Sequence, residues 1–319
     1  MTPSPVFIGL DVAKVTLDVA LRPSGEQWSV PNDEAGVAAL VDRLRPLHPA
    51  LVVCEATGGF ERAAIAMLAA AGLPVVVANP RQIRDFARAT GQLAKTDAID
   101  AAILALFAER VRPTPRALPS DAAQLLDALL TRRRQLLEML VAEKNRLGFA
   151  PRPLHKGIQQ HIRWLERQLD DVTKDLADQI ERSPVWRAKD DLLQSVPGVG
   201  PIVSAVLLAE LPELGTLSHK QIATLAGVAP LARDSGTLRG KRMVWGGRAG
   251  VRTALYLAAL CGRRWNPQLR VFYERLLAAG KPKKVAIIAC ARKLLTILNA
   301  MLRDTARWRA PELAIQYSC

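Results

Sequence analysis

The first 110 residues alternate between short apolar runs and stretches of helical periodicity, and this order constrains the fold more than any other feature of the chain. Residues 6–13 form a compact apolar run, and residues 16–21 alternate between apolar and polar side chains, like a partner strand across a tight turn. A third short run covers residues 27–30. Together these runs predict a three-stranded antiparallel meander.

Helix and strand signals continue to alternate after the meander. We expect a helix at about 33–44, a buried strand at 50–54, a helix at about 60–71, a strand at 74–78, and helices from residues 80 and 97. Strands that alternate with helices form a partly parallel sheet covered on both faces. A meander followed by strand, helix, strand and helix is the order of a ribonuclease-H-like α/β domain.

Four acidic residues occupy positions that this fold brings together. Asp11 lies in the first strand, and Glu55 follows the first strand after the meander. Asp97 and Asp100 share the first turn of a helix. An isolated acidic pair in this position more often only interacts favourably with the partial positive charge at the start of the helix. Four converging carboxylates repel one another unless cations are bound. Their hard oxygen atoms suit two Mg²⁺ ions, with Mn²⁺ as an alternative, which can activate a nucleophile and stabilise the leaving oxygen of a phosphodiester.

The middle of the chain reads as two long helices. Ser120 can cap a helix that runs to about Leu147, and Pro151 and Pro153 interrupt it. In the next helix, apolar residues recur every three or four positions: Ile158, Ile162, Leu165, Leu169, Val172, Leu176 and Ile180. This seam predicts an antiparallel helical hairpin. The sequence leaves open whether the seam also pairs with another subunit.

The positive charge is concentrated in the C-terminal part. The formal net charge is +14, and residues 192–319 contain 19 basic and 6 acidic residues, whereas residues 1–110 contain 10 and 12. A basic segment of this kind indicates a polyanionic partner, most simply nucleic acid, because Lys and Arg release condensed counterions from phosphates. An anionic membrane fits less well, because the basic residues do not form one amphipathic surface helix.

Several protein classes are excluded by composition. The four cysteines form no CxxC pair and the four histidines lack zinc-finger spacing, which argues against a structural zinc ion or a disulfide framework. The start of the chain lacks a charged segment followed by an apolar signal core, and Gly72 and Pro74 break the apolar run 63–78. We therefore expect a folded cytoplasmic protein, with no membrane segment.

Two motifs in the basic part indicate contacts with DNA phosphates. Gly198 and Gly200 lie between two short helices, where they allow a tight turn and present N–H groups to an anion, as in helix-hairpin-helix modules. A tight turn without a ligand is the alternative. The second motif, residues 227–248, is rich in glycine and contains one Trp. Its cations are Arg233, Arg239, Lys241, Arg242 and Arg248.

Seven short motifs follow one another along nearly the whole chain: Phe7-Ile-Gly-Leu-Asp-Val-Ala-Lys14, Glu55-Ala-Thr-Gly-Gly59, Asn79-Pro-Arg81, Lys95-Thr-Asp-Ala-Ile-Asp100, Pro197-Gly-Val-Gly200, Asp234-Ser-Gly236 and Gly246-Gly-Arg248. In these segments the chain resembles the insertion-sequence 110 transposases, or DEDD recombinases, which are guided by a bridge RNA. The resemblance implies that Asp11, Glu55, Asp97 and Asp100 form the metal-binding tetrad of a RuvC-like domain. It also implies that Ser235 is the nucleophile that forms a phosphoserine link to cleaved DNA.

The same resemblance implies the partners. They are target DNA, donor DNA and the bridge RNA, which pairs with both DNAs. It further implies a homo-oligomer, a dimer or a tetramer, whose active sites combine the acidic residues of one subunit with the serine of another. Residue chemistry makes the serine reasonable in its own right, because a hydroxyl in a glycine-flanked, cationic loop meets a phosphate whose charge is already neutralised.

We therefore expect four parts: a RuvC-like catalytic domain at 1–115, a coiled-coil spacer at 116–190, a basic C-terminal transposase domain at 191–310, and a tail at 311–319. The expected reaction is strand cutting and rejoining by transesterification. Three alternatives remain open. They are a metal-dependent, junction-resolving nuclease that uses water, an actin-like kinase suggested by Ile8-Gly-Leu-Asp-Val-Ala13, and a DNA-binding protein without catalysis.

Overall fold

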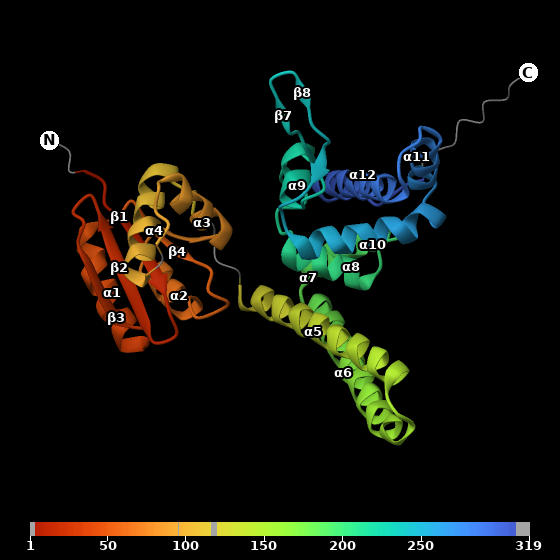
Figure 1. Cartoon of the computed structure of the whole chain (residues 1–319), viewed down its shortest axis with the longest axis horizontal. Helices are drawn as coiled ribbons and strands as arrows, with labels where there is room; N and C mark the ends of the chain where they lie inside the picture. Colours follow the sequence, from red (N-terminus) through yellow and green to blue (C-terminus); the bar gives the residue numbers. More distant parts are fainter. Residues whose placement is uncertain (1–3, 95, 116–119, 311–319) are drawn as a thin grey trace, which may run out of the picture. The chain divides into compact units, whose positions relative to one another are not determined.

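The computed structural model describes residues 4–94, 96–115 and 120–310. The chain divides into two compact units between residues 118 and 119 (Figure 1). Lys95, the first residues of the expected spacer and the expected tail at 311–319 lie outside the described residues.

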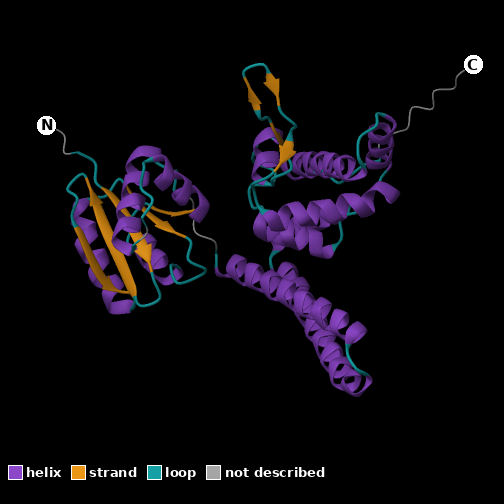
Figure 2. Cartoon of the chain, in the orientation of Figure 1, coloured by secondary structure: helices purple, strands orange, loops and turns teal. Residues whose placement is uncertain are grey.

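The first unit is built on one mixed five-stranded sheet (Figure 2). Its strands are β1 (Phe7–Val12), β2 (Thr16–Arg22), β3 (Gln27–Pro31), β4 (Leu51–Glu55) and β5 (Val75–Ala78). The spatial order is β3-β2-β1-β4-β5, with antiparallel pairing from β3 to β1 and parallel pairing from β1 to β5. The predicted meander and the predicted parallel part of the sheet are both confirmed.

Helices cover both faces of this sheet. On one face, α1 (Glu34–Leu44) and α2 (Arg62–Ala70) pack on the apolar side chains that β1, β2 and β4 direct toward them. A 3₁₀ turn, Arg45–Leu47, follows α1. On the other face, α3 (Pro80–Ala89) and α4 (Asp97–Val111) pack on Phe7, Leu51 and Val53. Along β1 and β4, successive side chains therefore point alternately to one helical layer and to the other.

The backbone of α4 touches β1 at Gly9. A Cβ atom on Gly9 would lie 2.0 Å from the Ala101 carbonyl oxygen and 2.3 Å from the Ala105 nitrogen. Arg112, directly after the end of α4, lies over the Phe7 ring at 5.3 Å, whereas the charges of Asp97 and Asp100 at its start reach Asp11, so α4 runs antiparallel to β1. The first turn of α4 is thereby placed at the C-terminal end of β1.

The second unit begins with a helical hairpin of α5 (Asp121–Phe149) and α6 (His155–Arg182), joined by a 3₁₀ turn at Arg152–Leu154. Ser120 caps α5 as predicted, with its hydroxyl accepting from the Ala123 N–H at 3.3 Å. The apolar seam of α6 packs on α5 around Leu136 and Leu140. Leu126 and Leu176, near the base, belong to the same core as the C-terminal helices, so the hairpin and these helices form one unit.

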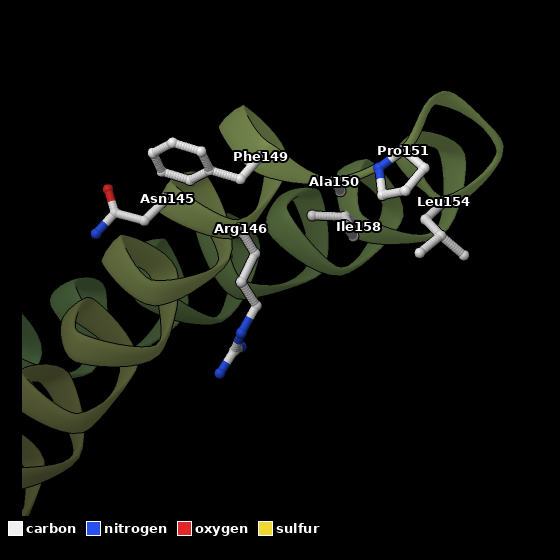
Figure 3. Close-up of a pocket in the computed structure, with 7 residues that line it drawn as sticks. All are labelled: Asn145, Arg146, Phe149, Ala150, Pro151, Leu154 and Ile158. Carbon is white, nitrogen blue, oxygen red and sulfur yellow. The ribbon is translucent and has the colours of Figure 1, made fainter.

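The tip of the hairpin carries an open depression of about 500 Å³ (Figure 3). Phe149, 92% exposed, and Leu154, 58% exposed, line it together with Pro151 and Ile158. Among the described residues, no carboxylate and no predicted site residue lines this depression.

Further helices complete the second unit around a common core. They are α7 (Pro184–Gln194), α8 (Pro201–Glu210), α9 (His219–Leu225), α10 (Ala249–Trp265), α11 (Pro267–Ala278) and α12 (Lys283–Asp304). Helix α11 was not predicted. By length and composition alone α12 could cross a membrane, but Leu294, Leu295 and Leu298 are fully buried against neighbouring helices, as in a core helix of a folded domain.

Candidate active site

Asp11 and Glu55 lie on the sheet face that α4 covers. Asp11 follows Phe7 and Gly9 on the same side of β1, and Glu55 follows Leu51 and Val53 on the same side of β4. The parallel register pairs Leu10 with Cys54, so the next residues along the two strands, Asp11 and Glu55, are neighbours. Two of the predicted acids are therefore brought together by strand register alone.

Asp97 and Asp100 join them from the first turn of α4. Thr96 is the N-cap, and its hydroxyl accepts from the Ile99 N–H at 3.3 Å. Asp97 is exposed and Asp100 is half-buried. Carboxylates are favoured at this end of a helix because unsatisfied N–H groups give it a partial positive charge. The helix start that places these acids is thus fixed by its own cap.

The charges of the other three acids reach Asp11. Burial, together with the charges of Asp100, Asp97 and Glu55, raises the pKa of Asp11 to about 6. A carboxyl group with this pKa holds its proton more tightly than a solvated aspartate, because ionising it adds a like charge to the cluster. The set predicted from the sequence is therefore gathered into one region of negative potential.

A fifth carboxylate, Asp18, belongs to the same region and was missed in the sequence. Asp18 on β2 lies directly opposite Asp11 in the antiparallel register, and its charge also raises the pKa of Asp11. The Ser29 hydroxyl donates a hydrogen bond to the Asp18 carboxylate. The strand alternation at residues 16–21 contained this signal, because it places Asp18 on the same face as Ala20, which packs beneath α4.

The donor set suits a divalent cation. Carboxylate oxygen atoms are the ligands that Mg²⁺ and Mn²⁺ prefer, and a bound cation would relieve the repulsion that raises the pKa of Asp11. Within the described ranges, no three side chains of His, Cys, Asp or Glu stand close enough together to hold a metal ion in their present arrangement. The carboxylates surround a common region without forming a closed cage.

The loop after Glu55 is ordered by Glu61. The Glu61 carboxylate accepts from the Thr57 hydroxyl at 2.7 Å, the Thr57 N–H at 3.2 Å and the Gly59 N–H at 2.8 Å. Burial by itself would raise the pKa of Glu61, but these hydrogen bonds outweigh it and lower the pKa. Glu61 is therefore an anionic clamp that fixes the chain leaving β4.

Ser235 lies in a small hairpin of the second unit. The strands β7 (Asp234–Ser235) and β8 (Leu238–Arg239) pair across a turn in which Gly236 has a φ of +55°, a conformation that favours glycine. The hairpin projects away from the helices of its unit, drawn in teal in Figure 1. Ser235 is exposed, so its hydroxyl is open to a large ligand such as DNA.

Four of the five predicted cations surround this hairpin. Arg233 lies over the Trp245 ring at 5.8 Å, and Arg242 approaches Asp234 at 3.8 Å. Arg239 and Lys241 are exposed, and among the described residues neither forms an ion pair. The short strands β6 (Pro230–Leu231) and β9 (Met243–Val244) pair at the base. We expected a phosphate-facing loop here, and the structure shows that this loop contains two short strand pairs.

Arg248 has a different environment from the one we expected. Its guanidinium donates to Glu213 through two hydrogen bonds, of 2.5 and 2.7 Å, and to the Glu210 carbonyl at 2.8 Å. The ion pair is only partly exposed, with 30% of the Arg248 side chain and 21% of the Glu213 side chain accessible. Arg248 therefore anchors the base of the hairpin, and its charge is already compensated.

The two glycines of the predicted phosphate-binding turn differ from each other. Gly198 has a φ of +103°, and a Cβ atom there would lie 2.5 Å from the Gly262 Cα atom of α10. Gly200 precedes α8 and has open space on its Cβ side. Close packing against α10 thus explains Gly198 without a ligand, whereas Gly200 leaves the start of α8 accessible.

Comparison with known proteins is consistent with this arrangement. A transposase family model, that of the DEDD transposases of IS110 elements, matches residues 8–148. A second model, described as transposase of the IS116/IS110/IS902 family, matches residues 190–274. The first match covers the acidic residues of the first unit, and the second covers Ser235 and its hairpin.

Some relatives align with most of this chain, and another aligns with about a third of it. The pilin gene-inverting protein of Moraxella lacunata is 28% identical over 313 residues, which covers 94% of this chain and 97% of that protein. The uncharacterized 43.6 kDa protein of insertion element IS110 from Streptomyces coelicolor is 25% identical, with 94% of each chain covered. The uncharacterized 42 kDa protein of IS900 from Mycobacterium paratuberculosis is 39% identical over 120 residues, 36% of this chain and 30% of that protein.

Proposed function

Because the chain belongs to the IS110 family of transposases and is therefore a DNA-cutting enzyme, we propose that it cuts and rejoins DNA strands through a covalent phosphoserine intermediate. The observation that carries this proposal is the convergence of Asp11, Glu55, Asp97 and Asp100 at one end of the sheet. A protein that only bound DNA would gain nothing from gathering negative charge in one place.

Asp11, Glu55, Asp97 and Asp100 would hold the divalent ions, and Mg²⁺ suits their oxygen atoms best. Such ions supply Lewis-acid stabilisation of negative charge at a phosphodiester. The chain itself contributes rigid positions for these carboxylates, because β1 and β4 fix Asp11 and Glu55, and the Thr96 cap fixes the start of α4. Asp18, held by Ser29, adds negative charge beside Asp11.

Ser235 is the proposed nucleophile. Its Oγ atom would form a bond to the phosphorus of a DNA phosphodiester, while one bridging P–O bond breaks and the freed oxygen takes up a proton to become a hydroxyl group. The serine proton leaves to water. Arg239 and Lys241 lie in the same hairpin segment and would neutralise the phosphate that Oγ approaches. The linkage conserves the energy of the broken bond, so that strands can be rejoined without a nucleotide cofactor.

We propose further that a bridge RNA selects the target and donor DNA, and that the active protein is a dimer or a tetramer. The 19 basic residues between positions 192 and 319 support binding of more than one nucleic acid strand. Residues 230–244, as described, form short strands and no helix that could enter a DNA groove to contact base edges. This is consistent with a target that is chosen by base pairing with an RNA. The relative's name, pilin gene-inverting protein, indicates a DNA rearrangement for that protein.

The test is recombination between plasmids that carry donor and target sites, with the RNA transcribed beside the gene. Ser235→Ala should abolish recombination, and so should Asp11→Asn, whereas Thr237→Ala, which removes the neighbouring hydroxyl of the same turn, should retain most of the activity. If Ser235→Ala recombines normally while Asp11→Asn does not, the acidic residues act without this serine, and the phosphoserine intermediate is overturned. If both variants recombine normally, the acidic residues are not the catalytic site.

A further inference from the structure

The corner between α10 and α11 presents a large aromatic side chain to solvent. Trp265, the last residue of α10, is 75% exposed, and in the same turn Arg264 is also exposed. Burying a tryptophan stabilises a fold, so an indole left in water at the end of a core helix gives up that gain. Such a residue is typical of a binding surface.

The corner is rigid. Asn266 is fully buried, and its side-chain Oδ1 atom accepts from the Gln268 and Leu269 N–H groups at 3.1 and 3.3 Å, which fixes the start of α11 directly after Trp265. One turn earlier, Gly262 packs against the Gly198 turn. Trp265 is thus held between two fixed elements, and little conformational entropy would be lost when a ligand stacks on it.

The charge around the corner is predominantly positive. Residues 262–293 contain nine basic residues and one acidic residue, Glu274. Arg264 and Arg270 are exposed, and within the described part of the chain none of these nine cations forms an ion pair with a carboxylate. Several instead lie over aromatic rings, such as Arg275 and Lys293 over Phe272 at 5.2 and 4.9 Å. The surface is therefore cationic and uncompensated.

This surface is distinct from the serine hairpin. The hairpin is anchored by Arg248 at the first end of α10, and Trp265 is at the other end. A helix rises about 1.5 Å per residue, so the 17 residues of α10 separate the two places by roughly 25 Å. A strand bound at Trp265 would leave the hairpin free for its own DNA.

We propose that the α10–α11 corner is a binding surface for single-stranded nucleic acid, in which a base stacks on Trp265 and Arg264 and Arg270 contact the phosphates on either side. Single strands suit this surface better than duplex because a base within a duplex is already stacked on its neighbours. Aromatic stacking with flanking cations is the general way in which proteins hold single strands without reading their sequence.

The test uses the full-length protein and a labelled oligothymidine strand, with binding followed by fluorescence anisotropy in the absence of divalent cations. Trp265→Ala should weaken binding about tenfold, whereas Trp265→Phe, which keeps an aromatic face, should remain within about threefold of the unchanged protein. Trp164→Ala is the matched control, because Trp164 is also exposed but lies on the helical hairpin, where acidic and basic residues alternate. It should bind as the unchanged protein does.

Two further measurements distinguish the contribution of base stacking from that of charge, and binding at this surface from the chemistry proposed for Ser235. Replacing both Arg264 and Arg270 by Ala should reduce the slope of log affinity against log salt by about 1.4, whereas Trp265→Ala should leave the slope unchanged. Ser235→Ala should bind the oligothymidine normally, so this surface and the proposed chemistry can fail independently. Unchanged binding by Trp265→Ala, an equal loss in Trp164→Ala, or an equal loss for a duplex of the same length would overturn the proposal.

Discussion

Asp11 and Asp18 lie directly opposite each other on neighbouring antiparallel strands, with both carboxylates on the sheet face that α4 covers. Like charges in this cross-strand position destabilise a sheet. Helix α4 adds Asp97 and Asp100, and β4 adds Glu55. The first unit therefore gathers several like charges around Asp11, and this property leads to measurable consequences.

The first consequence is a dependence of stability on pH. The pKa of Asp11 in the folded protein is about 6, above its ordinary value of 3.8. A raised pKa favours the folded state below the unfolded pKa, and this contribution is lost as the pH rises through about 6. With a chelator present to remove divalent cations, the free energy of unfolding should be measured from about pH 4 to pH 7. Over this range it should decrease more in the unchanged protein than in Asp11→Asn.

The control for this measurement is Asp42→Asn, which removes an exposed carboxylate of α1. Urea unfolding across the same pH range should give Asp42→Asn the profile of the unchanged protein. If Asp11→Asn also keeps that profile, burial and neighbouring charge do not govern the titration of Asp11.

Divalent cations should stabilise the first unit. A ligand that binds only the folded state raises the unfolding temperature by mass action, and we expect a rise of about 4 °C or more at saturating Mg²⁺. The rise should be absent in Asp11→Asn and retained in Asp42→Asn. Thermal unfolding followed by circular dichroism, with and without Mg²⁺, measures it, and an equal rise in both variants would locate the ion elsewhere.

Gly9→Ala should disrupt the contact that positions α4. The new Cβ atom would fall 2.0 Å from the Ala101 carbonyl oxygen, and a backbone atom cannot move aside without displacing the helix. We expect a loss of about 3 kcal/mol in the free energy of unfolding. Gly148→Ala is the control, because this exposed glycine of α5 has open space around it and should become about 0.5–1 kcal/mol more stable. Similar values for the two would show that α4 can shift freely.

Arg248→Ala should loosen the base of the serine hairpin. The variant breaks a two-bond ion pair and leaves Glu213 partly buried without this guanidinium, at an expected cost of about 2 kcal/mol. Arg248→Lys should recover only part of the loss, since an ammonium group cannot form two parallel hydrogen bonds with one carboxylate. Urea unfolding followed by Trp fluorescence measures the free energy of unfolding of the three proteins. Full recovery in Arg248→Lys would show that Arg248 contributes only its charge and not its two hydrogen bonds.

Much of the first unit is predictable from its sequence because the signals there are local and agree with one another. Strand alternation, the Thr96 cap and the order of elements together specify which residues meet, and the four acids predicted from that order do share one region. The sequence did not identify Asp18 as part of the acidic group, because a single polar residue in an alternating strand is normally a solvent-facing position. Only the position of α4 above this face of the sheet shows otherwise.

The second unit was harder because its contacts are between residues far apart in the chain. Arg248 looked like one more free cation of a basic loop, and only the fold brings Glu213 to it. The apolar seam of α6 predicted that this helix packs on another helix, but the seam could not specify whether that helix belongs to the same chain or to another subunit. In the described residues the seam packs on α5. Helix α11 was missed because it starts at Pro267 directly after α10 ends, with no loop between them to mark its start.

The most direct test of the proposed mechanism is a search for the covalent intermediate. The protein, its RNA and Mg²⁺ would be incubated with a nicked DNA substrate that prevents rejoining, and the products separated on a denaturing gel and digested for mass spectrometry. The mechanism predicts a protein–DNA adduct whose linkage maps to Ser235, present in Thr237→Ala and absent in Ser235→Ala. Cleaved DNA without any adduct, or an adduct at another residue, would contradict it.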